Sequence, residues 1–477
     1  MTNLKGSNLN RREAAGPKGE GRDSPSTFPA YPEYKDSGVE WLGEVPAHWQ
    51  VERNKRMFRI VSRPVGKSGS QYQLLSLTLR GVVPRDLDGK GKYPAEFDTY
   101  QVVQPGDVVF CLFDIDETPR TVGYSSLHGM ITGAYSVAKA LPESHPGYVY
   151  YYYYHIDLRK GLRPFYTGLR KVVRPETFSN LEMPCPPVLE QVAISNFLDH
   201  ETARIDALVE EQQRLIALLK EKRQAVISHA VTKGLDPDVL MKDSGVEWLG
   251  KVPAHWEVCK LGHVCRLQGG YAFNSSRFSQ DGVTIVRMNN LKRGRLDLEN
   301  SVKIPPEDCD SRFQLAGGDI LYGMSGSIGD TGSLGNYAIV NRDDLPAQLN
   351  QRVGRFVLER GLLGNYLELV IQSSSFYEQV LDQVTGTAQF NVSSDQVESC
   401  KIAFPEMEEQ ELIAQGVQAR LVKMDRLMEL AADQIHYLQE RRSALISAAV
   451  TGKIDVRGWT PPADAVPADQ DAPMEAV

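Results

Sequence analysis

The sequence predicts an α+β protein in which two mixed α/β globular domains are joined by two long antiparallel coiled-coil helices related by an internal pseudo-twofold. Three observations predict this fold. A short motif recurs almost unchanged, a helical block recurs at a similar offset, and the segments between them contain short apolar runs separated by turns. At roughly 150 residues per domain, 477 residues suffice for two large units or three smaller ones.

The first repeat is a motif of near-identical sequence. Residues 35–51 read KDSGVEWLGEVPAHWQV and residues 242–258 read KDSGVEWLGKVPAHWEV, so 15 of 17 positions agree at an offset of 207. A functional interpretation would make His48 and His255 of this motif bases or ligands. Because no second titratable partner accompanies either histidine along the chain, we favour a packing role for both.

The second repeat covers the helical blocks. It aligns at a constant offset of 219, and its matched pairs include Glu190 with Glu409, Gln191 with Gln410, Asp206 with Asp425 and Arg223 with Arg442. Apolar residues recur every three to four positions in both blocks, which predicts helices. The 43 residues from Glu190 to Thr232 would form roughly 65 Å of helix. A narrow apolar stripe needs a partner, and the counterpart helix is the simplest one. Packing of each helix on its own variable block is the alternative.

These repeats divide the chain into six segments. They are a disordered leader at 1–34, a first domain at 35–185, a first helix at 186–234, a second domain at 235–403, a second helix at 404–458 and a disordered tail at 459–477. Inside the two domains, short runs typical of strands are Tyr72–Leu79, Asp107–Leu112, Val283–Met288 and Asp319–Leu321. The two variable blocks look little alike, as expected for one frame that carries two different inserts.

Charge and composition limit the function classes. The net charge is −8, but residues 52–185 hold 18 Lys/Arg against 13 Asp/Glu, while residues 259–404 hold 14 against 16. A nucleic-acid interface needs only a local basic face, so the total does not exclude DNA. The sequence has no apolar run of transmembrane length and no secretory leader. Six cysteines without a C-x-x-C pair indicate reduced thiols, so we expect a cytoplasmic protein that does not bind membranes.

Catalytic motifs are missing from the sequence. We find no phosphate-binding G-x-x-x-x-G-K-[ST] loop, no Asn/Asp-Pro-Pro-aromatic motif of amino-methyltransferases and no H-E-x-x-H zinc motif. A paired-carboxylate-plus-lysine nuclease core is also absent. We therefore predict no catalytic residue, no metal site and no cofactor in this chain.

Two stretches rich in basic residues are the main candidates for DNA contact. The stretch between Asp281 and Asp297 contains no acid and supplies Arg287, Asn289, Asn290, Lys292, Arg293 and Arg295. The stretch between Asp157 and Glu176 also lacks acids and supplies Lys160, Arg163, Arg170, Lys171 and Arg174. Lysine and arginine neutralise phosphates, and Arg and Asn match the edges of guanine and adenine. Gln389 and Asn391 are further candidates. Solvated charged loops remain the alternative. The tyrosines at 150–154 could stack on bases, but core packing is the favoured interpretation.

Taken together, the arrangement resembles the specificity subunit of Type I restriction–modification systems over about residues 35–458. The resemblance depends on the paired KDSGVEWLG-VPAHW motifs, the Glu-Gln pair near the start of each helix and the Ala-Val-Thr at each helix end. The run GDILYGMSGSIG at 318–329 also looks like part of a target-recognition domain. The first domain departs from this run, because it has Asp114, Asp116 and Glu117 where the second domain has serine and glycine.

The resemblance implies a non-catalytic subunit that binds double-stranded DNA. Each target-recognition domain would read one half of a bipartite, asymmetric site, and the helices would set the spacing. Two methyltransferase subunits would dock on the frame, bring S-adenosylmethionine and flip the target adenine. Restriction or translocase subunits would add ATP and Mg²⁺. Two alternatives remain open: a divergent nuclease or methyltransferase, and a coiled-coil scaffold that binds only protein.

Overall fold

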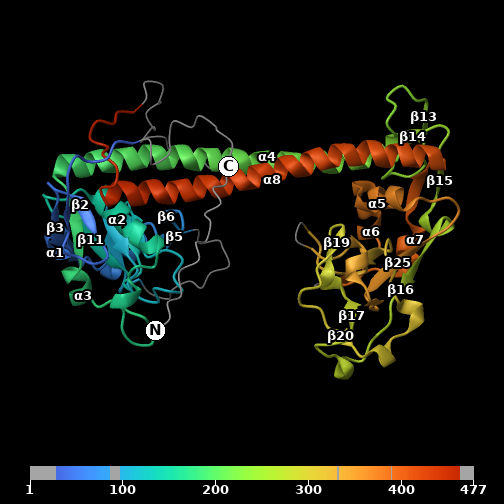
Figure 1. Cartoon of the computed structure of the whole chain (residues 1–477), viewed down its shortest axis with the longest axis horizontal. Coiled ribbons are helices and arrows are strands. Elements are labelled where there is room, and N and C mark those ends of the chain that lie inside the picture. The colour runs from blue at the N-terminus through green and yellow to red at the C-terminus, as the bar shows by residue number, and fades with distance from the viewer. Residues whose placement is uncertain (1–27, 86–96, 330–331, 388, 462–477) are drawn as a thin grey trace, which may run out of the picture. The chain divides into compact units, whose positions relative to one another are not determined.

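The computed structural model describes residues 28–85, 97–329, 332–387 and 389–461. Two long helices dominate it, α4 (Val188–Lys233) and α8 (Met407–Val450), as the second repeat predicts (Figure 1). The chain forms two compact units. Unit 1 comprises residues 1–211 and 433–477, and unit 2 comprises residues 212–432. Each unit therefore contains one half of α4 and one half of α8. No helix in the described ranges is long and apolar enough to span a membrane.

The first domain is built on a four-stranded antiparallel sheet in unit 1. Its strand order is β4 (Phe58–Val61), β11 (Ser136–Ala140), β8 (Val108–Phe110) and β9 (Val122–Tyr124). Two further antiparallel pairs accompany it, namely the hairpin of β5 (Leu75–Thr78) and β6 (Gly81–Pro84) and the pair of β7 (Gln101–Val103) with β10 (Gly129–Ile131). The helices of this domain are α1 (Asn54–Met57), α2 (Pro146–Leu158) and α3 (Pro175–Asn180).

The second domain repeats this sheet in unit 2. The order is β16 (Cys265–Gly269), β25 (Val353–Leu358), β21 (Ile320–Gly323) and β23 (Tyr337–Ile339). In both sheets the last strand along the chain pairs with the first and the second. The other strands are β20 (Lys303–Ile304), β17 (Val283–Val286), β24 (Ala347–Leu349), β18 (Leu291–Lys292), β19 (Arg295–Leu296), β22 (Ser325–Gly326) and β26 (Phe390–Asn391). Helices α5 (Gly364–Gln372), α6 (Ser374–Leu381) and α7 (Ser394–Ser399) complete the domain. The α+β class predicted from the sequence is confirmed.

The repeated motif forms the same structure in each unit. In unit 1 it forms β1 (Tyr34–Asp36), β2 (Glu44–Pro46) and β3 (Gln50–Arg53), and β3 pairs with β12 (Glu182–Cys185) just before α4. In unit 2 it forms β13 (Met241–Asp243), β14 (Lys251–Pro253) and β15 (Glu257–Lys260), and β15 pairs with β27 (Lys401–Phe404) just before α8. Each motif is thereby tied to the start of a long helix.

The two long helices pack on each other within each unit. In unit 1, Arg442 of α8 forms an ion pair with Asp206 of α4 at 3.2 Å. In unit 2, Arg223 of α4 forms an ion pair with Asp425 of α8 at 3.4 Å. The first half of each helix meets the second half of the other, as antiparallel partners do. Packing against the counterpart helix, which the sequence favoured, is therefore present together with packing on the domain cores.

A buried carboxylate explains why the motif and the helix start recur together. Glu190 is 5% exposed and accepts hydrogen bonds from Tyr31 Oη at 2.6 Å and Trp49 Nε1 at 2.8 Å. The same carboxylate lies 2.8 Å from His48 Nε2. The sequence analysis found no titratable partner for His48, and that was wrong because the partner lies 142 positions away. Burial, and then the hydrogen bond to Glu190, holds the pKa of Tyr31 far above its ordinary value, so its hydroxyl stays a donor.

The second copy of this contact is more open. His255 Nε2 lies 2.8 Å from Glu409, whose side chain is 32% exposed. Trp256 Nε1 is buried and has no hydrogen-bond partner among the described residues. The neighbouring glutamine is alike in both copies. Gln191 accepts from His145 N at 2.8 Å, and Gln410 accepts from Leu363 N at 2.9 Å.

The prediction that residues 1–34 and 459–477 are disordered is partly wrong. Residues 1–27 and 462–477 lie outside the described residues. Residues 28–34 are packed, because Tyr31 is 3% exposed and the ring of Phe28 lies 5.1 Å from that of Phe197 on α4. Trp459, from the C-terminal flank, also contacts Phe197 at a ring distance of 5.4 Å. Aromatic side chains in these flanks cover the start of α4, which composition alone did not reveal.

We predict that Glu190→Ala destabilises the protein more than Glu409→Ala. Loss of Glu190 leaves two buried donors without an acceptor, so we expect about 2–4 kcal/mol less free energy of unfolding. Loss of the more exposed Glu409 should cost about 1 kcal/mol or less. Urea unfolding of the full chain, with both variants in parallel, measures the two costs. Equal losses of unfolding free energy in the two variants would contradict the expected difference between the buried Glu190 and the more exposed Glu409.

Candidate nucleic-acid interface

A basic hairpin lies against β23 of the second domain, where Gly294 N donates to the Tyr337 carbonyl at 2.9 Å. Strands β18 and β19 pair, with Lys292 opposite Arg295, and Arg293 and Gly294 form the tight turn with φ values of +33° and +95°. Positive φ at both central positions is the geometry of a type I′ hairpin turn. Lys292, Arg293 and Arg295 are all exposed. A two-stranded ribbon is one of the shapes that the major groove of DNA admits.

Asn290 does not belong to the exposed surface, which corrects the sequence analysis. It is 2% exposed, accepts from Arg287 N at 2.9 Å and donates to the Asp297 carbonyl at 2.8 Å. These bonds close the base of the hairpin and use the amide that was predicted to read a base. Its neighbour Asn289 is exposed. Arg287 is half-buried, and its Nε has no hydrogen-bond partner in the described chain.

Gln389 and Asn391 lie in a polar cluster beside β22. Gln389 Nε2 donates to Ser325 Oγ at 3.3 Å, and Arg352 Nη1 donates to Asn391 Oδ1 at 2.5 Å. Gln389 and Arg352 are exposed. The sequence analysis missed Arg352, although the polar run Asn350-Gln351-Arg352 directly after the buried strand β24 could have indicated it.

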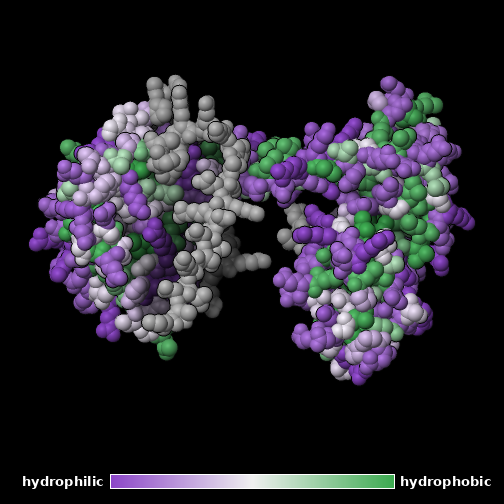
Figure 2. Space-filling view, in the orientation of Figure 1, coloured by the Kyte–Doolittle hydropathy of each residue, from purple (hydrophilic) through white to green (hydrophobic). Residues whose placement is uncertain are grey.

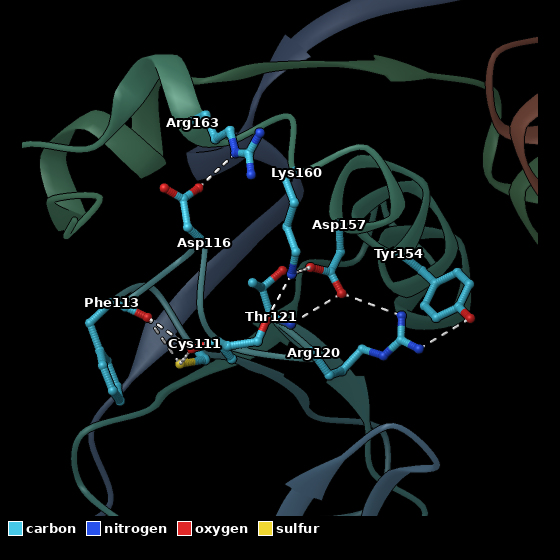
Figure 3. Close-up of polar contacts among 10 residues, drawn as sticks. Cys111, Phe113, Asp116, Arg120, Thr121, Tyr154, Asp157, Lys160 and Arg163 are labelled. Atoms are coloured by element: carbon cyan, nitrogen blue, oxygen red, sulfur yellow. Dashed lines mark hydrogen bonds and ion pairs between the residues drawn. The ribbon is translucent and has the colours of Figure 1, made fainter. Parts of the chain in front are cut away.

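In the first domain, acids from a distant loop neutralise part of the basic stretch. Arg163 Nε lies 2.7 Å from Asp116, and Lys171 Nζ lies 3.1 Å from Asp116 and 3.2 Å from Glu117. The hydrogen bonds from Lys171 and then Arg163 lower the pKa of Asp116. The stretch is free of acids along the chain, but in the fold Arg163 and Lys171 are paired with Asp116; Figure 3 shows the contact between Arg163 and Asp116.

Lys160 is also held inside the domain. Its Nζ lies 3.1 Å from Asp157 Oδ1 and donates to the Thr118 carbonyl at 2.7 Å (Figure 3). Arg170 and Arg174 are exposed, and neither side chain has a hydrogen-bond or ion-pair partner in the described part of the chain. These two arginines are thus the members of the stretch that remain available to an external anion.

The tyrosine run belongs to the core, as the favoured interpretation held. Tyr151, Tyr152, Tyr153 and Tyr154 of α2 are each no more than 6% exposed. Burial raises the pKa of Tyr150 to about 12. Rings that pack inside α2 and its neighbours are not available to stack on bases.

The described residues contain no group of three or more His, Cys, Asp or Glu side chains that could hold a metal ion. All six cysteines are free thiols. Burial raises the pKa of Cys265 to about 12 and that of Cys400 to about 11, so both thiols stay protonated at neutral pH. A thiolate nucleophile is therefore not formed at either position.

Comparison with known proteins agrees with this organisation. The family model "Type I restriction modification DNA specificity domain" matches residues 253–433. The Type I restriction enzyme MjaVIII specificity subunit of Methanocaldococcus jannaschii is 28% identical over 295 residues, which cover 61% of this chain and 66% of that protein. The match thus spans slightly less than two thirds of that relative.

Solved structures share the fold. A chain from work on complex assembly and conformational transition of the type I R-M system has a TM-score of 0.67 at 14% identity, covering 86% of this chain and 99% of that one. The HsdS subunit from Thermoanaerobacter tengcongensis has a TM-score of 0.51 at 14% identity, covering 86% and 98%. Residues 253–433 thus match the model of that family, and the chain as a whole has the fold of these two solved structures.

We predict that Asn290→Ala lowers the free energy of unfolding by about 1–3 kcal/mol, because it leaves buried backbone groups of the hairpin without partners. Asn289→Ala is the matched control at the adjacent exposed position and should change it by no more than about 0.5 kcal/mol. Denaturant titration of the two variants measures both values. A similar loss in both variants would show that Asn290 does not hold the hairpin.

Proposed function

We propose that this chain is the DNA-recognition subunit of a Type I restriction–modification complex, and that each domain reads one half of a bipartite, asymmetric site. The observation that carries this proposal is that the two domains share one strand order and one repeated frame but present different surfaces. The second domain presents the basic hairpin 291–296, whereas the first presents a loop with Asp116 and Glu117. Two readers of the same half-site would not need to differ in this way.

Charged and polar groups in both domains support contact with double-stranded DNA. Lys292, Arg293 and Arg295 lie together on an exposed hairpin, and Arg170 and Arg174 are exposed in the first domain. Cations neutralise phosphates whatever the sequence, while arginine and asparagine side chains in a groove discriminate bases. Two exposed amides could also contact bases. Asn289 precedes the cationic hairpin in the chain, and Gln389 lies beside Ser325.

Exposed apolar side chains on the helices support docking of two identical partners. Leu208 and Leu427 are matched at the offset of 219 and are 37% and 49% exposed. Leu218 and Tyr437 are matched in the same way and are 53% and 54% exposed. Each unit carries one member of each pair. Green patches on the helices in Figure 2 show apolar residues there among hydrophilic ones. Apolar exposure repeated in both copies favours the same kind of partner on each.

We propose methyltransferase subunits as these two partners, with S-adenosylmethionine bound to them rather than to this chain. Restriction or translocase subunits would add ATP and Mg²⁺ in the same complex. The helices would set the distance between half-sites, and rigid readers of one duplex face engage sites about 34–36 Å apart. The chain itself would be non-catalytic and would act in the cytoplasm, where the DNA that it binds lies.

Exchange of residues 259–403 for the corresponding block of a relative should change one half of the methylated sequence and leave the other half unchanged. Sequencing of methylated adenines in cells that express the exchanged chain with the methyltransferase measures this. A change in both halves, or in neither, would sink the assignment of one domain to one half-site.

The alternatives need separate controls. The purified chain alone, incubated with DNA and S-adenosylmethionine or with DNA and Mg²⁺, should neither methylate nor cut; turnover would favour a divergent enzyme. The complex with methyltransferase should shift DNA that the methyltransferase alone does not shift. Equal shifts would favour a scaffold that binds only protein.

Arg170→Ala and Arg174→Ala should each weaken DNA binding by the complex and reduce the slope of log affinity against log salt by about one per lost phosphate contact. Lys160→Met, whose ammonium is held by Asp157 and the Thr118 carbonyl, is the matched control and should keep the slope. Fluorescence anisotropy at several salt concentrations measures all three. Parallel slopes for all variants would place the first domain's DNA contact elsewhere.

A further inference from the structure

One arginine in unit 1 connects three helices. Arg442 of α8 donates from Nη1 to Tyr154 Oη of α2 at 2.5 Å. Its Nε lies 3.2 Å from Asp206 Oδ1 of α4 as an ion pair, and its Nη2 donates to Asp206 Oδ2 at 3.5 Å. The guanidinium carbon lies 5.2 Å from the centroid of the Tyr154 ring. A single side chain thus joins the first domain to both long helices.

The matched arginine in unit 2 makes the matched contacts. Arg223 of α4 donates from Nη1 to Gln372 Oε1 of α5 at 3.1 Å. Its Nε lies 3.4 Å from Asp425 Oδ1 of α8. Arg223 and Arg442 are related by the offset of 219, and so are Asp206 and Asp425. The arrangement therefore occurs twice, once in each unit.

Tyr154 and Gln372 occupy equivalent positions, although they differ in chemistry. Six residues earlier, the hydroxyls of Tyr148 and Tyr366 bond to equivalent carbonyls. Tyr148 donates to Pro184 at 3.0 Å and lies 3.4 Å from the Val450 carbonyl. Tyr366 donates to Ala403 at 2.9 Å and lies 3.4 Å from the Val231 carbonyl. The domain helix is thus fixed at one end by a tyrosine and at the other by the arginine.

The domain helix also has other contacts with the long helices: Tyr151 of α2 donates to Asp199 of α4 at 2.7 Å, and Gln224 of α4 donates to the Gln372 carbonyl of α5 at 2.7 Å. The arginine differs from these because it joins the domain helix to both long helices at once. The planar guanidinium offers donors in a fixed fork, so it holds the domain helix and the acidic residue in one geometry. The side chains of Arg442 and Arg223 are 23% and 28% exposed, so solvent screens their contacts only in part.

In unit 1 the contacts continue into the loop that precedes β9. Arg120 donates to Tyr154 Oη at 3.3 Å and forms an ion pair with Asp157 at 3.3 Å. Asp157 in turn holds Lys160, which reaches the Thr118 carbonyl (Figure 3). The position of this loop, which differs from its counterpart in the second domain, is therefore linked to α8.

We propose that Arg442 and Arg223 are positioning residues that fix the angle of each recognition domain on its helix segments, and that this angle determines which spacer length between half-sites the complex accepts. The inference rests on the proposed function. Neither arginine needs to touch DNA. Loss of either one removes the contact that ties its domain helix to both long helices, so that the domain can tilt and still reach a half-site displaced by one base pair.

The test is the distribution of spacer lengths among methylated sites in cells that express the full chain with its methyltransferase. Wild type should methylate one spacer length. Arg442→Met and Arg223→Met should add sites with one base pair more or less, with discrimination between spacer lengths reduced about tenfold, the size expected for loss of one charge-assisted hydrogen bond. Arg426→Met is the matched control, because Arg426 is 61% exposed and, among the described residues, pairs with Glu429 of the same helix α8.

A readout of half-site sequence separates positioning from general damage. The methylated bases in each half-site should stay the same in both variants, and only the spacer should broaden. Tyr154→Gln, which places the second domain's partner in the first, should keep a narrow distribution, whereas Tyr154→Ala should broaden it.

Three outcomes would overturn the inference. They are an unchanged spacer distribution in both arginine variants, an equal broadening in Arg426→Met, or an altered half-site sequence. If an arginine variant fails to accumulate as folded protein, Asp206→Asn and Asp425→Asn remove the second contact alone and must broaden the distribution. Absence of any bipartite methylated sequence in wild type would instead sink the proposed function.

Discussion

The need to cover the apolar stripe of each long helix shapes the whole chain. An isolated helix cannot bury its own apolar stripe, so α4 and α8 each bury theirs against the other and against a domain core. In unit 1, Leu198 and Ile205 of α4 share a core with Leu445 and Ile446 of α8. In unit 2, Ile227 of α4 shares a core with residues of α8 in the same way. Each domain consequently packs on one half of α4 and one half of α8.

This constraint explains why the repeated motif lies where it does. In unit 2 the motif follows α4 along the chain and packs Pro253 and Trp256 near Gly234, just beyond the helix end. In unit 1 no such covalent continuity exists, yet Pro46 and Trp49 pack against Gly452 beyond the end of α8. Gly452 has a φ of +71°, and a Cβ there would overlap Pro46. The N-terminal motif therefore closes α8 as the internal motif closes α4.

The repeats and their periodicity were predictable from the sequence because they are local or recur at fixed offsets. The two long helices, four of the strands and the α+β class follow from such patterns. The partners of Glu190 and of Asp116 could not be predicted from such patterns, because side chains far apart along the chain meet only in the fold. Asn290 illustrates a different limit. An amide beside arginines suits adenine, but the same amide also suits a turn, and only its 2% exposure decides between the two.

The two domains share their buried contacts but differ in surface charge, and a comparison of the matching sheet edges shows this. On the first domain's edge, Arg59 of β4 faces Lys139 of β11 directly, and both are exposed without an acidic partner in the described residues. On the second domain's edge, the corresponding Arg266 of β16 forms an ion pair with Glu359 at 2.8 Å. Like charges opposite each other on neighbouring strands cost stability. An anion bound at this edge, as expected of the DNA contact proposed above, would offset that cost. Buried contacts such as those of Tyr148 and Tyr366 are kept to within a few tenths of an ångström, while charge at the surface differs. The proposed function, in which one scaffold presents two different surfaces to DNA, requires that division.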